Sequence, residues 1–386
     1  MPAYPSVIKS KLPKTGTTIF TVMSALAQEH GAINLSQGFP DFLCDDKLIG
    51  LVEQYMRKGM NQYAPMPGIL PLREAIAEKA MRLYTAAYNP DTEITVTAGG
   101  TEAIYAAITA VVDEDDEVII FEPAYDCYAP SVTLNGGIPI YVELEPPGYS
   151  IDWNDVKKLI NQRTRMIIIN TPHNPSGMVM TAQYMKQLQK ITQNTDIIIL
   201  SDEVYEHIIF DGAEHQSVMR YPKLAERSFV VFSFGKTYHN TGWKMGYCLA
   251  PVELMREFRK AHQFIVFSAN TPMQHAYADI MKDPSHYLRL SEFYQEKRDY
   301  FLKLIKGSRF KATPASGSYF QMLDYKNISK EKDTDFAVRL TKEIGVASIP
   351  TSVFYHHGMD HQMLRFCFAK KEETVLKAVE NLKRFL

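Results

Sequence analysis

The sequence lacks the features that mark several large classes of protein. Its 386 residues include four cysteines, no two of them close enough for a CxxC pair, so neither a zinc site nor a disulfide framework is indicated. No apolar run approaches the length of a membrane span, and the N-terminus lacks a signal-peptide pattern. The formal net charge is -2, without blocks of like charge, which argues against a nucleic-acid partner. These absences favour a cytoplasmic enzyme.

What the sequence does contain is a regular alternation of short apolar runs and longer helical patterns. Several runs are apolar throughout, as expected for strands that helices cover on both faces. We expect seven strands, at residues 94–97, 118–121, 138–142, 166–170, 197–200, 229–233 and 246–250. Helical patterns near residues 101–112, 181–192 and 252–267 separate some of them. This alternation predicts an α/β fold with a mostly parallel sheet.

Both ends of the chain differ from the middle. Roughly the last hundred residues combine helices near 285–305, 334–344 and 372–386 with strands near 317–323 and 363–369, which is an α+β pattern. The first forty-odd residues hold one helical pattern and a loop that ends at Asp41. We therefore expect a large domain at residues 46–285 and a smaller domain built from residues 1–45 and 286–386.

Unusual residues follow the ends of the expected strands, and in a parallel sheet ligands bind outside those ends. Gly99-Gly100-Thr101 opens a helix after the first strand and suits a phosphate, although an ordinary strand–helix turn also uses glycine. Tyr125, after the second strand, could stack on a flat ring or simply pack. Asn174, after the fourth, could bond a ligand oxygen or form an Asx-turn.

Charged residues follow the fifth and sixth strands. Asp202, which opens Asp202-Glu-Val-Tyr205, closes a buried apolar strand, where an unpaired carboxylate is costly. It needs a cation or strong donors nearby, unless it only caps the next helix; a metal has no second acid or histidine cluster to support it. Lys236, in Ser233-Phe-Gly-Lys236, is either a surface lysine or a partly desolvated amine that suits a nucleophile or base. Lys244 could neutralise a phosphate.

Together these strand ends offer a helix start that can bind a phosphate, an aromatic ring that can stack on a flat ligand, and side chains with a carboxylate, a phenol, an amide and an amine. One ligand needs all of them. Pyridoxal phosphate forms an imine with a lysine, needs an acid to keep its pyridine nitrogen protonated, and needs an anchor for its phosphate. We therefore predict that Lys236 carries pyridoxal phosphate as a Schiff base.

These motifs resemble those of the fold-type-I, class I/II aminotransferases along nearly the whole chain. The resemblance runs from Asn34-Leu-Ser-Gln-Gly-Phe-Pro-Asp41 to Met363-Leu-Arg-Phe-Cys-Phe368, and it is most specific in the lysine signature between Ser233 and Gly246. Within the family, Glu122-Pro-Ala-Tyr-Asp-Cys-Tyr128 looks closest to the kynurenine/glutamine-phenylpyruvate branch and the related methionine aminotransferases.

The resemblance implies a role for each matched residue. Lys236 would bind the cofactor and then move a proton between the substrate α-carbon and the cofactor C4′ carbon. Asp202 would pair with the pyridine nitrogen. Arg365 would clamp the substrate α-carboxylate in a bidentate pair, assisted by Asn174 and the backbone of Gly38. Other residues would hold the cofactor: Tyr205 and Asn174 at its 3-oxygen, Tyr125 on its ring, and Gly99, Gly100, Thr101, Ser233 and Lys244 at its phosphate.

The resemblance also implies a homodimer, because Tyr63 would reach the phosphate of the neighbouring subunit. Two positions depart from the family pattern. Many relatives carry arginine where this chain has Lys244. Lysine keeps the positive charge but lacks the planar guanidinium fork of arginine. Related enzymes often have phenylalanine in place of Tyr125, and the extra hydroxyl has no evident role.

The substrate pocket is expected to be apolar. No second arginine is evident for a distal carboxylate, and Phe20 with the loop around Phe39 supplies apolar surface. We therefore expect methionine as the preferred amino donor, then aromatic amino acids, with a 2-oxo acid as acceptor. A carbon–sulfur β-lyase acting on cysteine conjugates is the main alternative, since the two reactions diverge only after the α-proton leaves. A non-catalytic regulatory protein that binds pyridoxal phosphate is disfavoured by the slightly negative charge.

Overall fold

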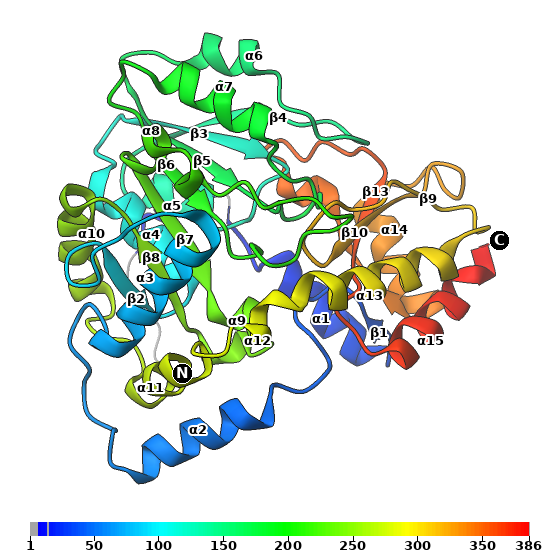
Figure 1. Ribbon diagram of the computed structural model, residues 1–386. Coiled ribbons are helices and arrows are strands. Elements are labelled where there is room, and N and C mark those ends of the chain that lie inside the picture. Colours follow the sequence, from blue (N-terminus) through cyan, green and yellow to red (C-terminus); the bar gives the residue numbers. More distant parts are fainter. Residues whose placement is uncertain (1–6, 14, 386) are drawn as a thin grey trace.

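The structure is a computed structural model that describes residues 7–13 and 15–385. Its strands form a large sheet and smaller ones (Figure 1). In the described residues the large sheet consists of β2 (Ile94–Thr97), β3 (Glu117–Glu122), β4 (Ile138–Glu143), β5 (Thr164–Asn170), β6 (Ile198–Asp202), β7 (Ser228–Ser233) and β8 (Gly246–Leu249). Their order is β2-β8-β7-β6-β5-β3-β4. β8 runs antiparallel to both neighbours and the other pairs are parallel, so the predicted mostly parallel, seven-stranded α/β sheet is confirmed.

Helices cover both faces of this sheet, which explains its continuously apolar strands. In β3, Val118 and Ile120 pack into the core on one face, whereas Ile119 and Phe121 pack into the core on the other. The first face is covered by α4 (Gly100–Val111), α5 (Tyr128–Leu134) and α10 (Val252–Ile265). The second is covered by α3 (Leu70–Tyr84), α6 (Trp153–Leu159), α7 (Ala182–Thr192), α8 (Pro222–Ala225) and α11 (Thr271–Ile280). α2 (Asp46–Arg57) packs on α11.

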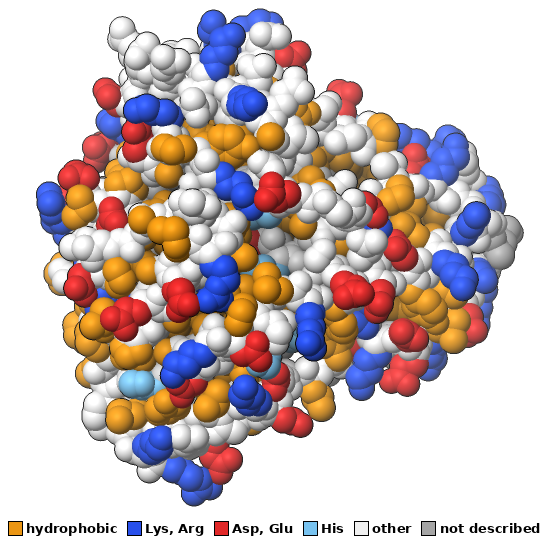
Figure 2. Space-filling view, in the orientation of Figure 1, with side chains coloured by type: hydrophobic (Ala, Val, Ile, Leu, Met, Phe, Trp, Pro, Cys, Tyr) orange, Lys and Arg blue, Asp and Glu red, His pale blue; other side chains and the backbone are white. Residues whose placement is uncertain are grey.

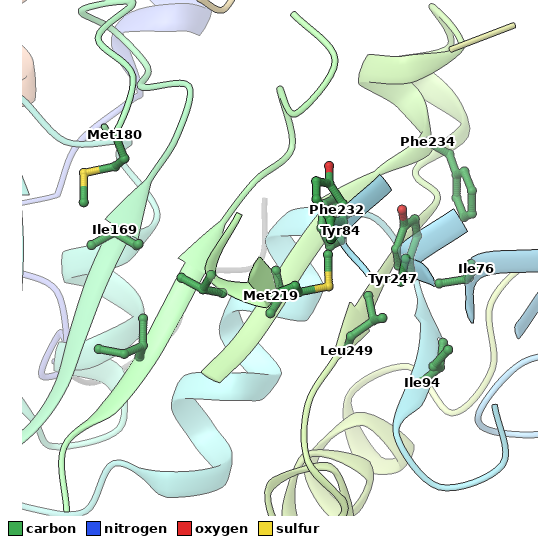
Figure 3. Packing of buried hydrophobic residues seen from close by; sticks show 14 of the residues in the cluster. Ile76, Tyr84, Ile94, Ile169, Met180, Met219, Phe232, Phe234, Tyr247 and Leu249 are labelled. Atoms are coloured by element: carbon green, nitrogen blue, oxygen red, sulfur yellow. The ribbon is translucent and has the colours of Figure 1, made fainter. Parts of the chain in front are cut away.

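Figure 3 shows part of the second core, where Phe232 of β7 and Tyr247 of β8 lie near Ile76 and Tyr84 of α3. The rings of Phe232 and Tyr247 are stacked with their centroids 5.0 Å apart. Because this core lies under the strands that lead to the carboxyl edge of the sheet, it holds that edge in place.

The two ends of the chain share a third core. β1 (Ile33–Asn34) pairs in parallel with β11 (Val346–Ala347), and Figure 1 shows α1 beside the C-terminal elements. A small antiparallel sheet has the order β12-β13-β10-β9, formed by β12 (Ile349–Pro350), β13 (Met363–Cys367), β10 (Phe320–Asp324) and β9 (Lys311–Ala312). The helices of this part are α1 (Ile19–Glu29), α12 (Ser285–Leu288), α13 (Leu290–Ile305), α14 (Asp333–Arg339) and α15 (Glu372–Leu382). The domain boundaries at residues 45/46 and 285/286 stay a prediction.

Three predicted elements of the C-terminal part differ from the structure. The helix expected at 285–305 is divided at Arg289 into α12 and α13. The strand expected at 317–323 begins at Phe320, because Ser318 has φ +60 and interrupts extended backbone. The helix expected at 334–344 turns into a π-helical segment at Leu340 and ends before Gly345, which has φ +75.

None of the described helices combines the length and the apolar character that a membrane span requires. On the face drawn in Figure 2, positive and negative side chains are interspersed, in keeping with the nearly balanced charge of the sequence.

Candidate active site

A cavity of about 300 Å³ lies at the carboxyl edge of the large sheet. Its lining includes every predicted site residue except Tyr63: Phe20, Gly38, Gly99, Gly100, Thr101, Tyr125, Asn174, Asp202, Tyr205, Ser233, Lys236, Lys244 and Arg365. Lys244 precedes β8, and it lies at this edge because β8 is antiparallel to β7. The fold therefore brings together residues that the sequence places at separate strand ends.

Lys236 lies on α9 (Phe234–Thr237), which begins directly after β7. Its Nζ atom donates a hydrogen bond of 2.7 Å to the Tyr319 hydroxyl and one of 3.2 Å to the Gly38 carbonyl. Burial lowers the pKa of the Lys236 amine to about 8, and the nearby Arg365 and Lys244 cations act in the same direction. About a tenth of such an amine is neutral at pH 7, far more than for an ordinary lysine, which suits a nucleophile or base.

Asp202 closes β6 and is 3% exposed. Its carboxylate accepts hydrogen bonds from the Tyr128 hydroxyl at 2.5 Å and from the Val204 amide at 3.3 Å. Burial raises the pKa of Asp202 to about 6, while the bond from Tyr128 acts in the opposite direction. At neutral pH the cavity thus holds a buried carboxylate, which favours a cationic group beside it.

The other end of the cavity is suited to an anion. α4 begins at Gly100, and its N-cap residue Gly99 has φ +89 and no side chain to bond the free amides. A Cβ atom on Gly99 would lie 3.5 Å from the Lys244 Nζ atom, so the ammonium group lies beside this helix terminus. The Thr101 hydroxyl is 3.4 Å from the hydroxyl of Tyr125. Free amides and an ammonium group that converge in this way favour a phosphate.

Arg365, on β13, supplies a buried guanidinium group. Its Nη1 atom donates to Asn174 Oδ1 at 2.7 Å and its Nη2 atom donates to the Ser36 carbonyl at 2.9 Å. Nε has no hydrogen-bond partner among the described residues. Burial lowers the pKa of Arg365 to about 10, which leaves it charged at neutral pH. The Phe320 ring centroid lies 3.9 Å from the guanidinium carbon and that of Phe20 lies 5.2 Å away.

The structure adds detail at three predicted positions. The Gly38 carbonyl accepts from Lys236, while the backbone oxygen that contacts Arg365 belongs to Ser36. Phe39 does not line the cavity and is 45% exposed. Tyr63 also lies outside it and is 84% exposed, and its role toward a neighbouring subunit stays a prediction.

Two residues that bond predicted site residues were not themselves predicted. Tyr128 lies three residues after Tyr125, at the start of α5, and this short spacing could have indicated a second side chain near Asp202. Tyr319 arrives from the small sheet, and no local pattern links it to Lys236. The hydroxyl of Tyr125, which had no evident role, lies within reach of Thr101.

The chain is similar to known proteins over nearly its whole length. The family described as aminotransferase class I and II matches residues 30–382. The chain belongs to this aminotransferase family. Among curated relatives, methionine aminotransferase of Escherichia coli K12 is 50% identical, with 98% of this chain and 99% of the relative covered. Human kynurenine–oxoglutarate transaminase 1 is 32% identical, with 93% and 94% covered.

Solved structures agree with this assignment. The crystal structure that identified the methionine aminotransferase function in Escherichia coli has a TM-score of 0.97 at 50% identity and covers 98% of this chain and 100% of that one. N-succinyldiaminopimelate aminotransferase from Mycobacterium tuberculosis has a TM-score of 0.94 at 34% identity, again with 98% and 100% covered. The predicted resemblance, the fold type and the aminotransferase activity are therefore confirmed.

Proposed function

We propose that this aminotransferase holds pyridoxal phosphate in the cavity and moves the amino group of an L-amino acid, methionine above all, to a 2-oxo acid. The observation that carries the proposal is the buried amine of Lys236, which lines the same cavity as the carboxylate of Asp202 and the anion site beside Lys244. Arg365 in the same cavity supports a substrate that carries a carboxylate.

The chemistry of the donor groups fits pyridoxal phosphate at three points. The amides at the start of α4 and the Lys244 ammonium suit its phosphate, the Asp202 carboxylate suits its protonated pyridine nitrogen, and the Lys236 amine suits its aldehyde. When bound, the cofactor supplies an electron sink for the bond that breaks at the substrate α-carbon. Tyr205 and Asn174 would donate hydrogen bonds to its 3-oxygen; burial raises the pKa of Tyr205, which keeps this phenol protonated.

The protein's own part in the reaction is to orient the substrate and move a proton. Arg365 would fix the α-carboxylate through its uncommitted N–H groups. With its pKa near 8, Lys236 would take the proton from the substrate α-carbon and return it at the cofactor C4′ carbon. Ring stacking by Tyr125 would keep the cofactor plane facing this amine.

The side-chain preference follows from the walls of the cavity. Phe20, Met245 and Phe320 supply apolar surface, and among the described lining residues Arg365 is the sole arginine. A second carboxylate, as in aspartate, therefore finds no further guanidinium fork among these described lining residues. The Escherichia coli relative named as a methionine aminotransferase supports the thioether as the preferred side chain. An apolar pocket discriminates modestly, so phenylalanine and tyrosine should also react.

A half-reaction screen tests this preference. The holoenzyme is mixed with single amino acids in the absence of an oxo acid, and the loss of visible cofactor absorbance is followed in stopped flow. Methionine should react fastest, followed by the aromatic amino acids. If aspartate and glutamate react fastest, the apolar-pocket proposal fails.

We also propose a homodimer, with the cytoplasm as the predicted location. Tyr63 is 84% exposed and packs edge to face on Phe267, with ring centroids 5.4 Å apart, while Phe264 is 86% exposed. Exposed aromatic side chains are typical of interfaces, and a partner subunit would bring Tyr63 to its phosphate. Sedimentation of the holoenzyme should give twice the chain mass, and a monomer that is fully active would contradict the shared site.

A further inference from the structure

A buried tyrosine, Tyr319, contacts the amino group of Lys236 but is not part of the cavity lining. Tyr319 is 0% exposed and does not itself line the cavity. Its ring packs edge to face on Tyr205, with centroids 5.1 Å apart, and is tilted against Tyr294 at 5.8 Å. The rings of Tyr205 and Tyr294 thus hold the Tyr319 ring in place, which fixes the position of its hydroxyl.

The hydroxyl of Tyr319 connects two groups. It accepts the hydrogen bond from Lys236 Nζ at 2.7 Å, and it donates to the Gly38 carbonyl. The same carbonyl is 3.2 Å from Lys236 Nζ, so the three groups form a closed triangle. Both contacts to the lysine are hydrogen bonds, and together they hold its amino group in one position.

The two partners of the lysine differ in what they can offer. A carbonyl only accepts hydrogen bonds, whereas a phenol can accept from an ammonium group and donate to a neutral amine. A lysine that takes up and returns a proton passes through both states. Tyr319 is therefore suited to satisfy Lys236 in either state without movement of the backbone.

We propose that Tyr319 is a positioning residue that holds the amino group of Lys236 whenever this amine is not attached to the cofactor. The proposal rests on the function proposed for Lys236. It predicts that loss of the Tyr319 hydroxyl affects proton movement and leaves substrate binding nearly unchanged, because Tyr319 lies outside the lining of the cavity.

The test compares Tyr319→Phe with Tyr294→Phe in the full chain. Tyr294 is a matched control: it is also 0% exposed and packs on the same ring, but its hydroxyl contacts His239 Nδ1 at 3.0 Å and not Lys236. Both changes remove one buried hydroxyl and keep the ring. Thermal melting should show similar stability for the two variants.

The first measurement needs no catalysis. Cofactor-free protein is acetylated with acetic anhydride between pH 6 and 10, and the modification of Lys236 is quantified by peptide mass spectrometry. Only the neutral amine reacts, so the rate profile gives its apparent pKa. Apart from Tyr319 itself, the charged and titratable groups that face Lys236 are the same in the unaltered protein and both variants: Asp202, Tyr205, Lys244, Arg365 and Cys367.

In Tyr319→Phe the ammonium loses an acceptor, so the apparent pKa of Lys236 should fall by about one pH unit. It should be unchanged in Tyr294→Phe. With the cofactor bound, kcat for methionine should fall about tenfold or more in Tyr319→Phe, while KM stays within about twofold.

An apparent pKa that is unchanged or higher in Tyr319→Phe would overturn the positioning role. Borohydride reduction of the unaltered holoenzyme separates this outcome from failure of the proposed function. If reduction attaches the cofactor to Lys236 but the Tyr319→Phe pKa does not fall, only the inference about Tyr319 is lost. If no cofactor is attached to Lys236, both proposals fail.

Discussion

Replacing Arg365 with lysine should weaken recognition of the substrate carboxylate and leave the residues proposed to bind the cofactor unchanged. The guanidinium group already commits one N–H to Asn174 and one to Ser36, and Nε has no partner among the described residues. Lysine keeps the positive charge, but its ammonium group cannot contact both protein acceptors and also present a fork to a carboxylate. Arg365→Lys therefore removes one of the two bonds expected to a bound carboxylate.

The size of the effect follows from what changes on binding. A hydrogen bond to a charged group contributes about 1.5–3 kcal/mol. The acceptor left unpaired by lysine, on Asn174 or Ser36, costs about 1–3 kcal/mol, but it does so in the free and the bound enzyme alike. That cost lowers stability without weakening affinity. The dissociation constant of a carboxylate should thus rise roughly tenfold to 150-fold.

The assay uses 3-phenylpropionate, which offers a carboxylate and an apolar tail but no amino group to react. Its dissociation constant is measured by titration of the holoenzyme, through the change in cofactor absorbance. Arg298→Lys is the matched control, because Arg298 is 3% exposed and bonds Asp211 and the Ala315 carbonyl away from the cavity. The control should lose stability and keep its affinity. A change below about threefold in Arg365→Lys would refute the carboxylate clamp.

Three further predictions concern the cofactor and the core. Lys236→Ala should abolish transamination and cofactor attachment by borohydride, and near-normal turnover would end the proposal for this lysine. Because an acid is neutral below its pKa, protonation of Asp202 below about pH 6 should weaken the binding of pyridoxal phosphate by up to roughly tenfold per pH unit. Equilibrium dialysis should show this step. Asp202→Asn keeps the titrations of Lys236 and of the cofactor's phosphate, so its affinity for the cofactor should depend less steeply on pH. Lys79→Met should lower the free energy of unfolding in urea by about 3–5 kcal/mol, because it leaves the buried carboxylate of Glu206 without its ammonium partner. The double variant Lys79→Met, Glu206→Gln should recover part of this loss.

Much of the large sheet could be predicted because its signals are local. A strand covered on both faces is apolar throughout, and the residues that interrupt such runs lie at the ends where a parallel sheet binds ligands. Gly99, Asn174, Asp202 and Lys236 all follow this rule, and the structure gathers them in one cavity. The same logic fails for Lys244, whose place at this edge depends on the antiparallel direction of β8. Its short distance from Lys236 along the sequence indicated that residue instead.

What could not be predicted depends on contacts between distant parts of the chain. Tyr319 meets Lys236 only after the small sheet has packed against the large one, so no periodicity in either segment predicts the contact. The helix divides at Arg289, although no glycine or proline lies between residues 285 and 305 to indicate a break. Tyr63 illustrates the same limit between chains, since its proposed role requires a second subunit.

The cavity draws its walls from the large sheet with its two cores and from the third core, and this division separates the two tasks of the cavity. The residues proposed for the cofactor follow the strands of the large sheet, whereas Phe20 and Arg365 belong to the part formed by the two chain ends. Several contacts join the two parts, among them two side-chain hydrogen bonds: Arg365 with Asn174, and Lys236 with Tyr319. Both contacts orient the groups that would act on the substrate, so a small shift between the cores would change the angle of the carboxylate to the amine. The cofactor anchors would move together with their sheet. Changes at the boundary of the cores should therefore alter substrate preference before they weaken cofactor binding.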